Sequence, residues 1–370
     1  MGAEYRIIDA DGHVMELDEQ LREYIGPPFN QLEWHRSYSF WPGLTSDGFL
    51  RSLRAPGGWA GGGTGPDAHD WLRFLDLNGI ERTILYPTQG LTHGLIREPE
   101  WAVALARAYN DWLYDRFMRV SPRLVGVALL PVQDIGEAVK ELRRCVTELG
   151  MPGAVLPAVI AGGRTVAGRE FDPLWAAAEE LDVPISTHGG TSLELGLDGI
   201  GGNFTVGHLL EHPFAQMKQL GAMIFEGVFE RFPRLRYGCL ECGIGWVPYF
   251  MDRMDEELER KGRYSPHCKR KPSEYVRSGN IFFSCEVEET ALPLAIEHVR
   301  PDVILWASDY PHERDQRDFS GDIPALLARD DVSAAVKRQI FYDNPTRFYR
   351  LDRLPPAPVV TRPALTSSSA

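Results

Sequence analysis

Residues 7–13 read IIDADGH, a short apolar run of β type that ends in polar side chains. Successive residues of a strand point to opposite faces, so this alternation predicts that Asp9, Asp11 and His13 share one face. Two of these side chains, Asp11 and His13, are suited to bind a metal ion. We therefore expect a strand whose end projects two metal ligands in the same direction.

Seven further β-type runs follow this one, and longer amphipathic stretches separate them. Eight alternating strand and helix units in a chain of this size favour an α/β fold of the (β/α)8 TIM-barrel type over a doubly wound sheet. The expected strands are 5–10, 82–86, 124–130, 153–156, 183–187, 235–240, 280–284 and 303–307. The expected helices are 67–78, 98–119, 134–149, 172–182, 213–231, 246–261, 287–299 and 322–342.

The composition of the 370 residues is that of an ordinary globular protein, with 44% hydrophobic and 25% charged residues. The net charge of −13 argues against a nucleic-acid-binding protein, because binding to phosphate backbones needs clustered Lys and Arg. No apolar run is long enough to span a membrane, and the N-terminus has no signal-peptide pattern. The five cysteines are scattered and odd in number, which is typical of reduced thiols. We expect a cytoplasmic protein that binds neither nucleic acid nor membranes.

Two segments interrupt the alternation within the barrel domain expected at residues 1–350. Residues 15–66 form an insertion after the first strand, rich in aromatic side chains and with a glycine-rich run at 57–63. Such a long loop is either a lid over the active site or a subdomain that decorates the barrel or forms a dimer surface. Residues 351–370 are rich in Pro, Ser and Thr, which predicts a C-terminal tail without regular structure.

Two other expected strands also end in side chains that bind metals. His188 directly follows the strand at 183–187, while Asp309 and His312 follow the strand at 303–307. The carboxyl ends of barrel strands meet at one mouth, so these residues should approach Asp11 and His13. Two imidazoles with one or two carboxylates can hold a divalent metal ion and leave a position open. Taken singly, each histidine could be structural and Asp309 could cap the next helix.

The order of these motifs resembles the amidohydrolase superfamily, in the branch that includes aminocarboxymuconate semialdehyde decarboxylase and gamma-resorcylate decarboxylase. The resemblance covers roughly residues 5–350. The motifs that carry it are residues 8–13, 187–190, 227–233, 243–248, 307–312 and 344–347.

The resemblance implies that Asp11, His13, His188 and Asp309 bind one divalent metal ion, zinc or manganese. Many relatives carry His or Glu at the position of Asp11, and a carboxylate there favours manganese relative to zinc. Residues 153–157 contain no Lys of the kind that bridges two metals in the hydrolytic branches, so a single ion is expected.

The chain departs from the decarboxylases at the end of the strand at 235–240. Those enzymes carry a histidine there that transfers protons, and this chain has Cys242 at the corresponding position, next to Glu241. If the strand stays regular, Glu241 shares a face with Cys239 and Tyr237 and points into the mouth. Glu241 is then a candidate general base, or else a residue that orients a metal-binding histidine.

His212 is a second candidate for the missing imidazole, although its neighbour Pro213 also fits the start of a helix. The catalytic candidates are therefore Glu241, His212 and Asp309. Arg51, Trp59 and His312 are the candidates for holding a planar, anionic substrate.

By resemblance, the expected reaction is the non-oxidative decarboxylation of a small aromatic or unsaturated carboxylic acid by a homo-oligomeric enzyme. The alternative is a hydrolase, in which Glu241 or Asp309 activates a metal-bound water toward an amide, lactone or other acyl bond. A barrel that only binds a partner is a third alternative. The presence of His13 and His188 together with Asp309 speaks against it.

Overall fold

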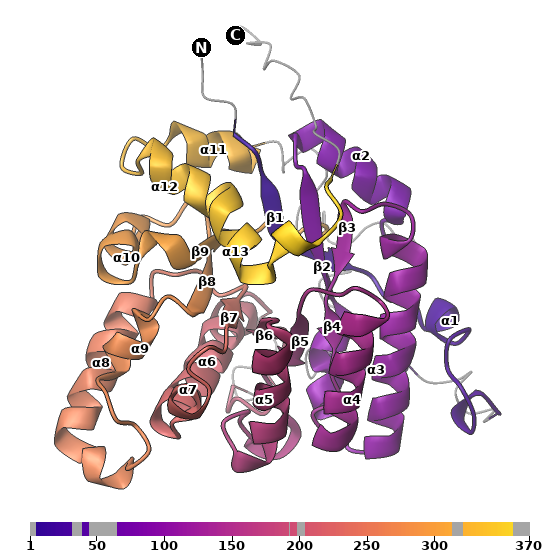
Figure 1. Ribbon diagram of the computed structural model, residues 1–370, viewed down its shortest axis with the longest axis horizontal. Coiled ribbons are helices and arrows are strands. Elements are labelled where there is room, and N and C mark those ends of the chain that lie inside the picture. Colours follow the sequence, from indigo (N-terminus) through magenta and orange to yellow (C-terminus); the bar gives the residue numbers. More distant parts are fainter. Residues whose placement is uncertain are drawn as a thin grey trace, which may run out of the picture.

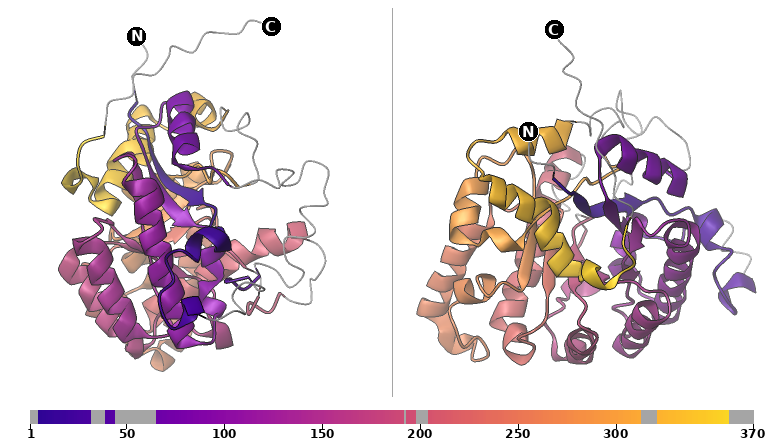
Figure 2. Two further views of the ribbon diagram at one scale, coloured as in Figure 1. Left: turned by 90° about the vertical axis from the view of Figure 1, so that its right-hand side faces the viewer. Right: turned by 45° about the horizontal axis from the view of Figure 1, so that its top comes forward.

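The computed structural model describes residues 5–31, 39–43, 65–191, 193–197, 204–312 and 321–357. In Figure 1 the strands lie at the centre and the helices surround them, and Figure 2 shows this from two further sides. The strands are β1 (Ile8–Val14), β2 (Arg82–Pro87), β3 (Leu124–Gly126), β4 (Ala128–Leu129), β5 (Ala154–Pro157), β6 (Ile185–His188), β7 (Tyr237–Leu240), β8 (Ile281–Cys285) and β9 (Ile304–Trp306). The α-helices are α1 (Asp18–Leu21), α2 (Ala68–Asn78), α3 (Pro99–Leu113), α4 (Ile135–Thr147), α5 (Asp172–Leu181), α6 (Phe204–Phe225), α7 (Val228–Arg231), α8 (Val247–Lys261), α9 (Pro272–Val276), α10 (Leu292–His298), α11 (Asp322–Ala328), α12 (Ala334–Arg338) and α13 (Asn344–Tyr349).

The strands run parallel and pair in chain order as two ladders, β1 to β3 and β4 to β9. β3 and β4 are halves of one strand, because Val127 between them donates its N–H to Leu85 of β2 while Ala128 donates to Gly153 beside β5. At the other junction, Asp309 N–H donates to the carbonyl of Asp11, which joins β1 to the chain after β9. The described residues thus form eight strand positions whose first and last meet, which confirms the TIM barrel.

The start expected for the helix at residues 213–231 is wrong. α6 starts at Phe204, and Pro213 lies inside it. A proline is favoured in the first turn of a helix, where no N–H partner is needed, and that preference misplaced the start. His212 therefore belongs to the body of a helix. The stretch expected as one helix at 322–342 is divided into α11 and α12, and Ser333 caps the start of α12.

Helix starts with clear capping residues were predicted more accurately. Asp67 accepts hydrogen bonds from the N–H groups of His69 and Asp70, and Asp70 accepts one from Asp67 in return. Gly79 ends the same helix with a φ of 65°. Asp134 caps α4 by accepting from the N–H of Glu137. Caps of this kind are worth about 1 kcal/mol each, which explains why the bounds of α2 and α4 follow from the sequence.

Side chains of α13 close one end of the barrel interior. The hydroxyl of Tyr349 donates to the carbonyl of Ala10 and lies 2.7 Å from the hydroxyl of Tyr86, which in turn lies 3.1 Å from Ser186 Oγ. A Cβ added to Gly238 would lie 2.8 Å from the ring of Phe348. These contacts fill the barrel at the amino ends of its strands, so the open end is the one to which Asp11 and His188 belong.

Only parts of the insertion at 15–66 are described. Phe40 and Trp41 are buried, and their rings contact those of Trp101 and His93. Thr92 of the 3₁₀ helix η5 (Gln89–Leu95) donates its hydroxyl to the carbonyl of Pro42. Residues 39–43 are therefore packed onto the barrel. Arg51, Trp59 and the glycine run at 57–63 lie outside the described residues.

Residues 351–357 begin the segment expected as a tail. They open with a short 3₁₀ helix, η14 (Leu351–Arg353), in which Leu351 is buried and Arg353 pairs with Asp182. This part packs against the barrel, and residues 358–370 lie outside the described chain. Among the described helices, none combines the length and the apolar character needed to cross a membrane.

Candidate metal centre

A β-bulge in β1 decides which of its polar residues face the barrel interior. Asp9 pairs with Thr83, and three residues later Gly12 pairs with Leu85, only two residues further along β2. The extra residue reverses the facing of the side chains beyond it. His13 then lies opposite Tyr86, whose hydroxyl contacts Ser186 inside the barrel.

The bulge overturns the expectation that Asp9 shares the face of Asp11 and His13. Asp9 accepts hydrogen bonds from the hydroxyls of Thr83 and Ser308 and from the N–H of Ser308. A Cβ added to Gly12 would point to the same side as Asp9, where it would lie 2.4 Å from the ring of Trp71 in α2. Asp9 therefore lies between the strands and the helices, where it links β1 to Thr83 and Ser308. It does not belong to the centre.

The two histidines present the same ring nitrogen to the centre. His13 Nδ1 donates to the carbonyl of Pro87 (2.9 Å), and His188 Nδ1 donates to the carbonyl of Gly189 (2.7 Å). A carbonyl only accepts, so each Nδ1 carries a proton and each Nε2 is the nitrogen that faces the centre. Metal-binding histidines are typically fixed by such a hydrogen bond to their second nitrogen.

Glu241 reaches the centre by a different route from the one expected. Thr187 and Cys239 are paired, and Thr187 bonds to Gln216 of α6 and to Tyr237, so this face of β7 points toward the helices. A regular strand would have turned Glu241 outward. β7 instead ends at Leu240, and Glu241 has a φ of 51°, which turns its side chain inward.

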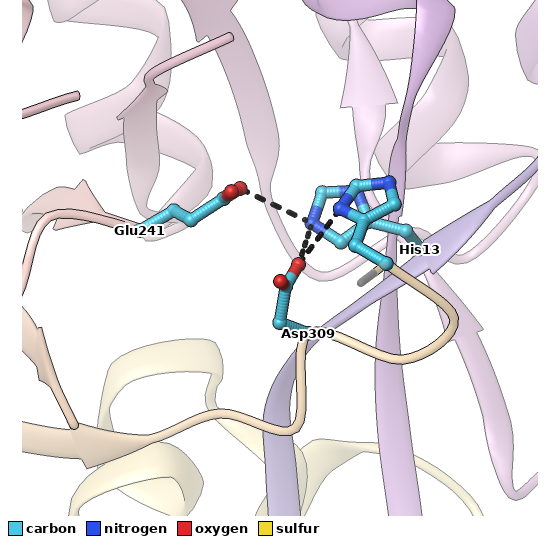
Figure 3. A group of neighbouring side chains, drawn as sticks. His13, Glu241 and Asp309 are labelled. Carbon is cyan, nitrogen blue, oxygen red and sulfur yellow. Dashed lines mark hydrogen bonds and ion pairs between the residues drawn. The ribbon is translucent and has the colours of Figure 1, made fainter. Parts of the chain in front are cut away.

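Asp309 follows β9 and also has a left-handed backbone, with a φ of 54°. Its Oδ1 lies 2.8 Å from His312 Nδ1 and 3.4 Å from His13 Nε2. His312 Nε2 lies 2.8 Å from the hydroxyl of Thr88. Asp309 is therefore not a helix cap. Figure 3 shows Glu241 and Asp309 approaching His13 from different sides.

Side chains meet at the mouth of the barrel in two overlapping groups that share His13. His13 Nε2 lies 3.6 Å from Asp11 Oδ1, 3.6 Å from Glu241 Oε2 and 3.4 Å from Asp309 Oδ1. His188 Nε2 lies 3.1 Å from Asp11 Oδ2 and from Glu241 Oε2. Ligands on one divalent ion, each bound at about 2.0–2.2 Å, stand about 3–3.5 Å apart.

Unsatisfied polar atoms at this point test whether a metal fits. Asp11 Oδ1, His13 Nε2 and Glu241 Oε2 are buried and make no hydrogen bond within the described part of the chain. Burying polar atoms without partners costs about 1–3 kcal/mol each. A cation among them would satisfy all three, so the residues present fit a divalent metal ion.

Burial and neighbouring charges shift the pKa values of the groups at the centre. Burial raises the pKa of Asp11 to about 7, although His188 opposes that rise. Burial lowers the pKa of His13 well below its ordinary value. For His188, burial acts in the same direction, but the carboxylates of Asp11 and Glu241 outweigh it and raise the pKa to about 9. An acid-rich, buried group of this kind attracts a cation.

His212 lies directly behind Glu241. Its Nε2 is 3.1 Å from Glu241 Oε1, and its side chain is buried. Burial would lower the pKa of His212, but Glu241 raises it to about 9. Cys242 belongs to none of the candidate metal-binding groups found among the described residues. Its thiol donates to the carbonyl of Cys239, and burial raises its pKa.

Two glutamates that the sequence analysis missed hold the loops around the centre. Glu16 accepts hydrogen bonds from the N–H groups of Thr88, Gln89 and Gly90 after β2. Glu289 does the same for Ile244 and Gly245 in the loop beyond Glu241. Their role depends on loops that are close only in the folded chain, so no local pattern indicates it.

A family model described as amidohydrolase matches residues 67–351, more than half of the chain. The chain belongs to the amidohydrolase family. The match begins after β1, so Asp11 and His13 precede it and are placed at the centre by the structure. The family predicted from the motifs is confirmed.

Two curated relatives of this amidohydrolase are decarboxylases. A gamma-resorcylate decarboxylase from Polaromonas sp. is 28% identical over 76% of this chain and 87% of that protein. A 2-amino-3-carboxymuconate-6-semialdehyde decarboxylase from Dictyostelium discoideum is 25% identical over 77% of this chain and 79% of that protein.

The fold is shared with solved structures. That of a dihydroxybenzoic acid decarboxylase from Polaromonas sp., with bound manganese and the inhibitor 2-nitroresorcinol, has a TM-score of 0.70 and 21% identity. It covers 95% of this chain and 98% of that one.

Proposed function

We propose that the protein is a metal-dependent, non-oxidative decarboxylase of a small aromatic or unsaturated carboxylic acid. The observation that carries this proposal is that Asp11 Oδ1, His13 Nε2 and Glu241 Oε2 meet at the barrel mouth, all buried and without a hydrogen bond in the described part of the chain. The decarboxylase relatives, one of them solved with manganese, support the same reaction class.

In this proposal, Asp11, His13, His188 and Asp309 hold a single divalent ion. The donor set is rich in carboxylate oxygen, which suits manganese, and zinc is the second candidate. When bound, the ion acts as a Lewis acid that neutralises the substrate carboxylate and an adjacent oxygen. The carbonyls of Pro87 and Gly189 keep both histidines in the tautomer that binds.

Glu241 and His212 handle the proton. Protonation of the carbon that bears the carboxylate comes first, and the carbon–carbon bond then breaks, leaving its electron pair on the ring as carbon dioxide departs. Glu241 Oε2 faces the metal ligands while its Oε1 contacts His212, so the pair can deliver a proton from the buried side. Asp309, which contacts His312, is the second candidate for proton transfer.

We propose that the anionic, planar substrate is bound by Arg51, Trp59 and His312. His312 lies at the rim, with its ring centroid 4.1 Å from that of His13. The other two belong to the insertion outside the described residues, and the proposal for them rests on their residue types.

The second candidate function is hydrolysis of an acyl bond, and the observation that favours it is Glu241 itself. A carboxylate beside a metal is a suitable general base for water, whereas the related decarboxylases are expected to use a histidine there.

A substrate screen separates the two functions. Manganese-loaded protein is incubated with hydroxybenzoates and muconate-like acids, and carbon dioxide release is measured beside hydrolysis of amides and lactones. Carbon dioxide release with no acyl hydrolysis supports the proposal. Acyl hydrolysis without carbon dioxide release replaces it with the hydrolase.

We also propose that the enzyme is a cytoplasmic homo-oligomer. All five cysteines are free, which suits a reducing compartment. Size measurement in solution tests the oligomer, and a monomer at working concentrations would refute it.

A further inference from the structure

Two histidines of α6 lie behind the metal centre, one helical turn apart. Residues 208–212 read HLLEH, so His208 and His212 occupy positions i and i+4 and lie on the same side of the helix. Their ring centroids are 4.6 Å apart. Two histidines at this spacing form zinc sites on helices of metalloproteases, including those with the H-x-x-E-H order found here.

Glu241 supplies a third donor to this pair. One ligand atom from each of His208, His212 and Glu241 lies within 4.8 Å of those of the other two. His212 Nε2 is 3.1 Å from Glu241 Oε1. Two imidazoles and a carboxylate are the ligand set of many zinc sites that keep a fourth position open.

The two oxygens of Glu241 serve different neighbours. Oε2 lies 3.1 Å from His188 and 3.6 Å from His13, both in the metal centre, while Oε1 faces His212 on the opposite side. A carboxylate so placed can bridge two cations. His208 is partly exposed whereas His212 is buried.

We propose that His208, His212 and Glu241 form a second, inhibitory site for a divalent cation, preferentially zinc. A cation there binds the oxygen of Glu241 and the nitrogen of His212 that would otherwise exchange a proton. The inhibition rests on the proposed function, in which these two groups handle the proton. Binding itself does not depend on it.

The preference for zinc follows from the two donor sets. The metal centre combines two histidines with Asp11, Asp309 and the facing oxygen of Glu241, and oxygen-rich sets suit manganese. The second site offers twice as many imidazole nitrogens as carboxylates, and imidazole suits zinc. Excess zinc should therefore fill the second site when excess manganese does not.

The test counts zinc ions by equilibrium dialysis followed by elemental analysis. The intact protein should bind two zinc ions per chain, the second more weakly than the first. His208→Ala should keep the first and weaken the second by at least about tenfold, because even the loss of a supporting partner of a ligand costs 10–100-fold. His267→Ala, a change at an exposed histidine in the loop after α8, is the matched control and should bind both ions.

Activity is the second readout. Excess zinc should inhibit carbon dioxide release by the intact protein, and His208→Ala should keep its activity at the same zinc concentration. A single zinc per chain in the intact protein, or an unchanged second ion in His208→Ala, overturns the site. Two ions that depend on His208 without inhibition overturn only the inhibitory role. If no carboxylic acid is turned over at all, the proposed function fails while the zinc count still decides the site.

Discussion

Glu241 and Asp309 are both non-glycine residues with a left-handed backbone, at φ of 51° and 54°. Such a conformation costs about 1–3 kcal/mol for a residue with a side chain, so it persists only where the surroundings hold it. Each of these residues directs a carboxylate to His13. The strain is therefore located where two strand ends deliver charged groups to one centre.

Replacing Glu241 by Gln tests its role in proton transfer. Gln keeps the shape of the side chain but cannot exchange a proton at neutral pH, so kcat should fall at least about 10²-fold while the metal stays bound. Steady-state kinetics and elemental analysis of the same sample measure both. Cys242→Ser is the control, because its thiol donates to the carbonyl of Cys239 and belongs to no candidate metal-binding group among the described residues, and it should retain most activity. Loss of metal in Glu241→Gln would make this residue a ligand instead.

Replacing His188 by Ala tests the ligand assignment. The variant loses the nitrogen that lies 3.1 Å from Asp11 Oδ2 and should retain little metal. Elemental analysis of protein purified without chelator measures the content. A metal content equal to that of the unmodified protein would exclude His188 as a ligand.

The residue types at the centre were predictable, but the direction of their side chains was only partly so. Asp11 and His13 face inward as the strand period predicts. Asp9 does not, because one bulge residue reverses the face, and the strand period alone does not include that extra residue. Glu241 faces inward although its predicted partners Cys239 and Tyr237 face outward. Glu241 was thus correctly expected to point inward, but its left-handed backbone, and not the strand period, is the reason.

At the scale of single elements, the bulge in β1 depends on Gly12. A Cβ at this position would lie 2.4 Å from the ring of Trp71 and 2.8 Å from Asp9 Oδ2 and Thr83 Oγ1. All three neighbours are buried and held by packing or hydrogen bonds, so none can easily move.

Gly12→Ala should therefore destabilise the fold by about 1–3 kcal/mol, the usual cost of overpacking a core. Denaturant unfolding measures the difference. Gly26→Ala is the control, since nothing lies within 4 Å of its added Cβ, and it should leave stability almost unchanged. Equal stability of the two variants would mean that β1 has no tight bulge.

η5 contains a buried histidine whose protonation opposes folding. His93 Nε2 donates to the carbonyl of Ala102, and burial lowers the pKa of His93 to about 4. In the unfolded chain, a histidine has a pKa near 6.5. Between these values only the unfolded chain takes up the proton, so stability is lost as pH falls from about 6.5 toward 4, at about 1.4 kcal/mol per pH unit.

His93→Gln keeps a side chain that can donate to Ala102 and removes this titration. Between pH 7 and pH 5.5, the unmodified protein should therefore lose about 1 kcal/mol more of its unfolding free energy than the variant does. Denaturant unfolding at both pH values measures this. His267→Gln, at an exposed site, should lose as much as the unmodified protein. The same slope in His93→Gln would show that His93 is not kept neutral.

Among the elements, those with a strong local signal were predicted and those without it were not. Asp67 and Asp134 mark the starts of α2 and α4 by hydrogen bonds within a few residues. The start of α6 was missed because Pro213 suggested a later one. Glu16 and Glu289 each accept hydrogen bonds from a loop that is distant in sequence. Only the fold brings each glutamate to its loop.

For the whole molecule, the alternation of apolar runs and amphipathic stretches predicted all eight strand positions of the barrel. The period of a parallel barrel is repeated along the entire chain, so small errors at single boundaries do not change the fold. The convergence of strand ends at one mouth then brings His188 to Asp11 and Asp309 to His13, although these residues are far apart in sequence.

The proposed decarboxylation depends on one metal ion at this mouth. The most direct test adds manganese stepwise to metal-free protein and follows carbon dioxide release from a substrate identified in the screen. We expect no release without metal, a linear rise with added manganese, and a plateau at one ion per chain. Full release by the metal-free protein, or a rise that continues to two ions per chain, would contradict this expectation.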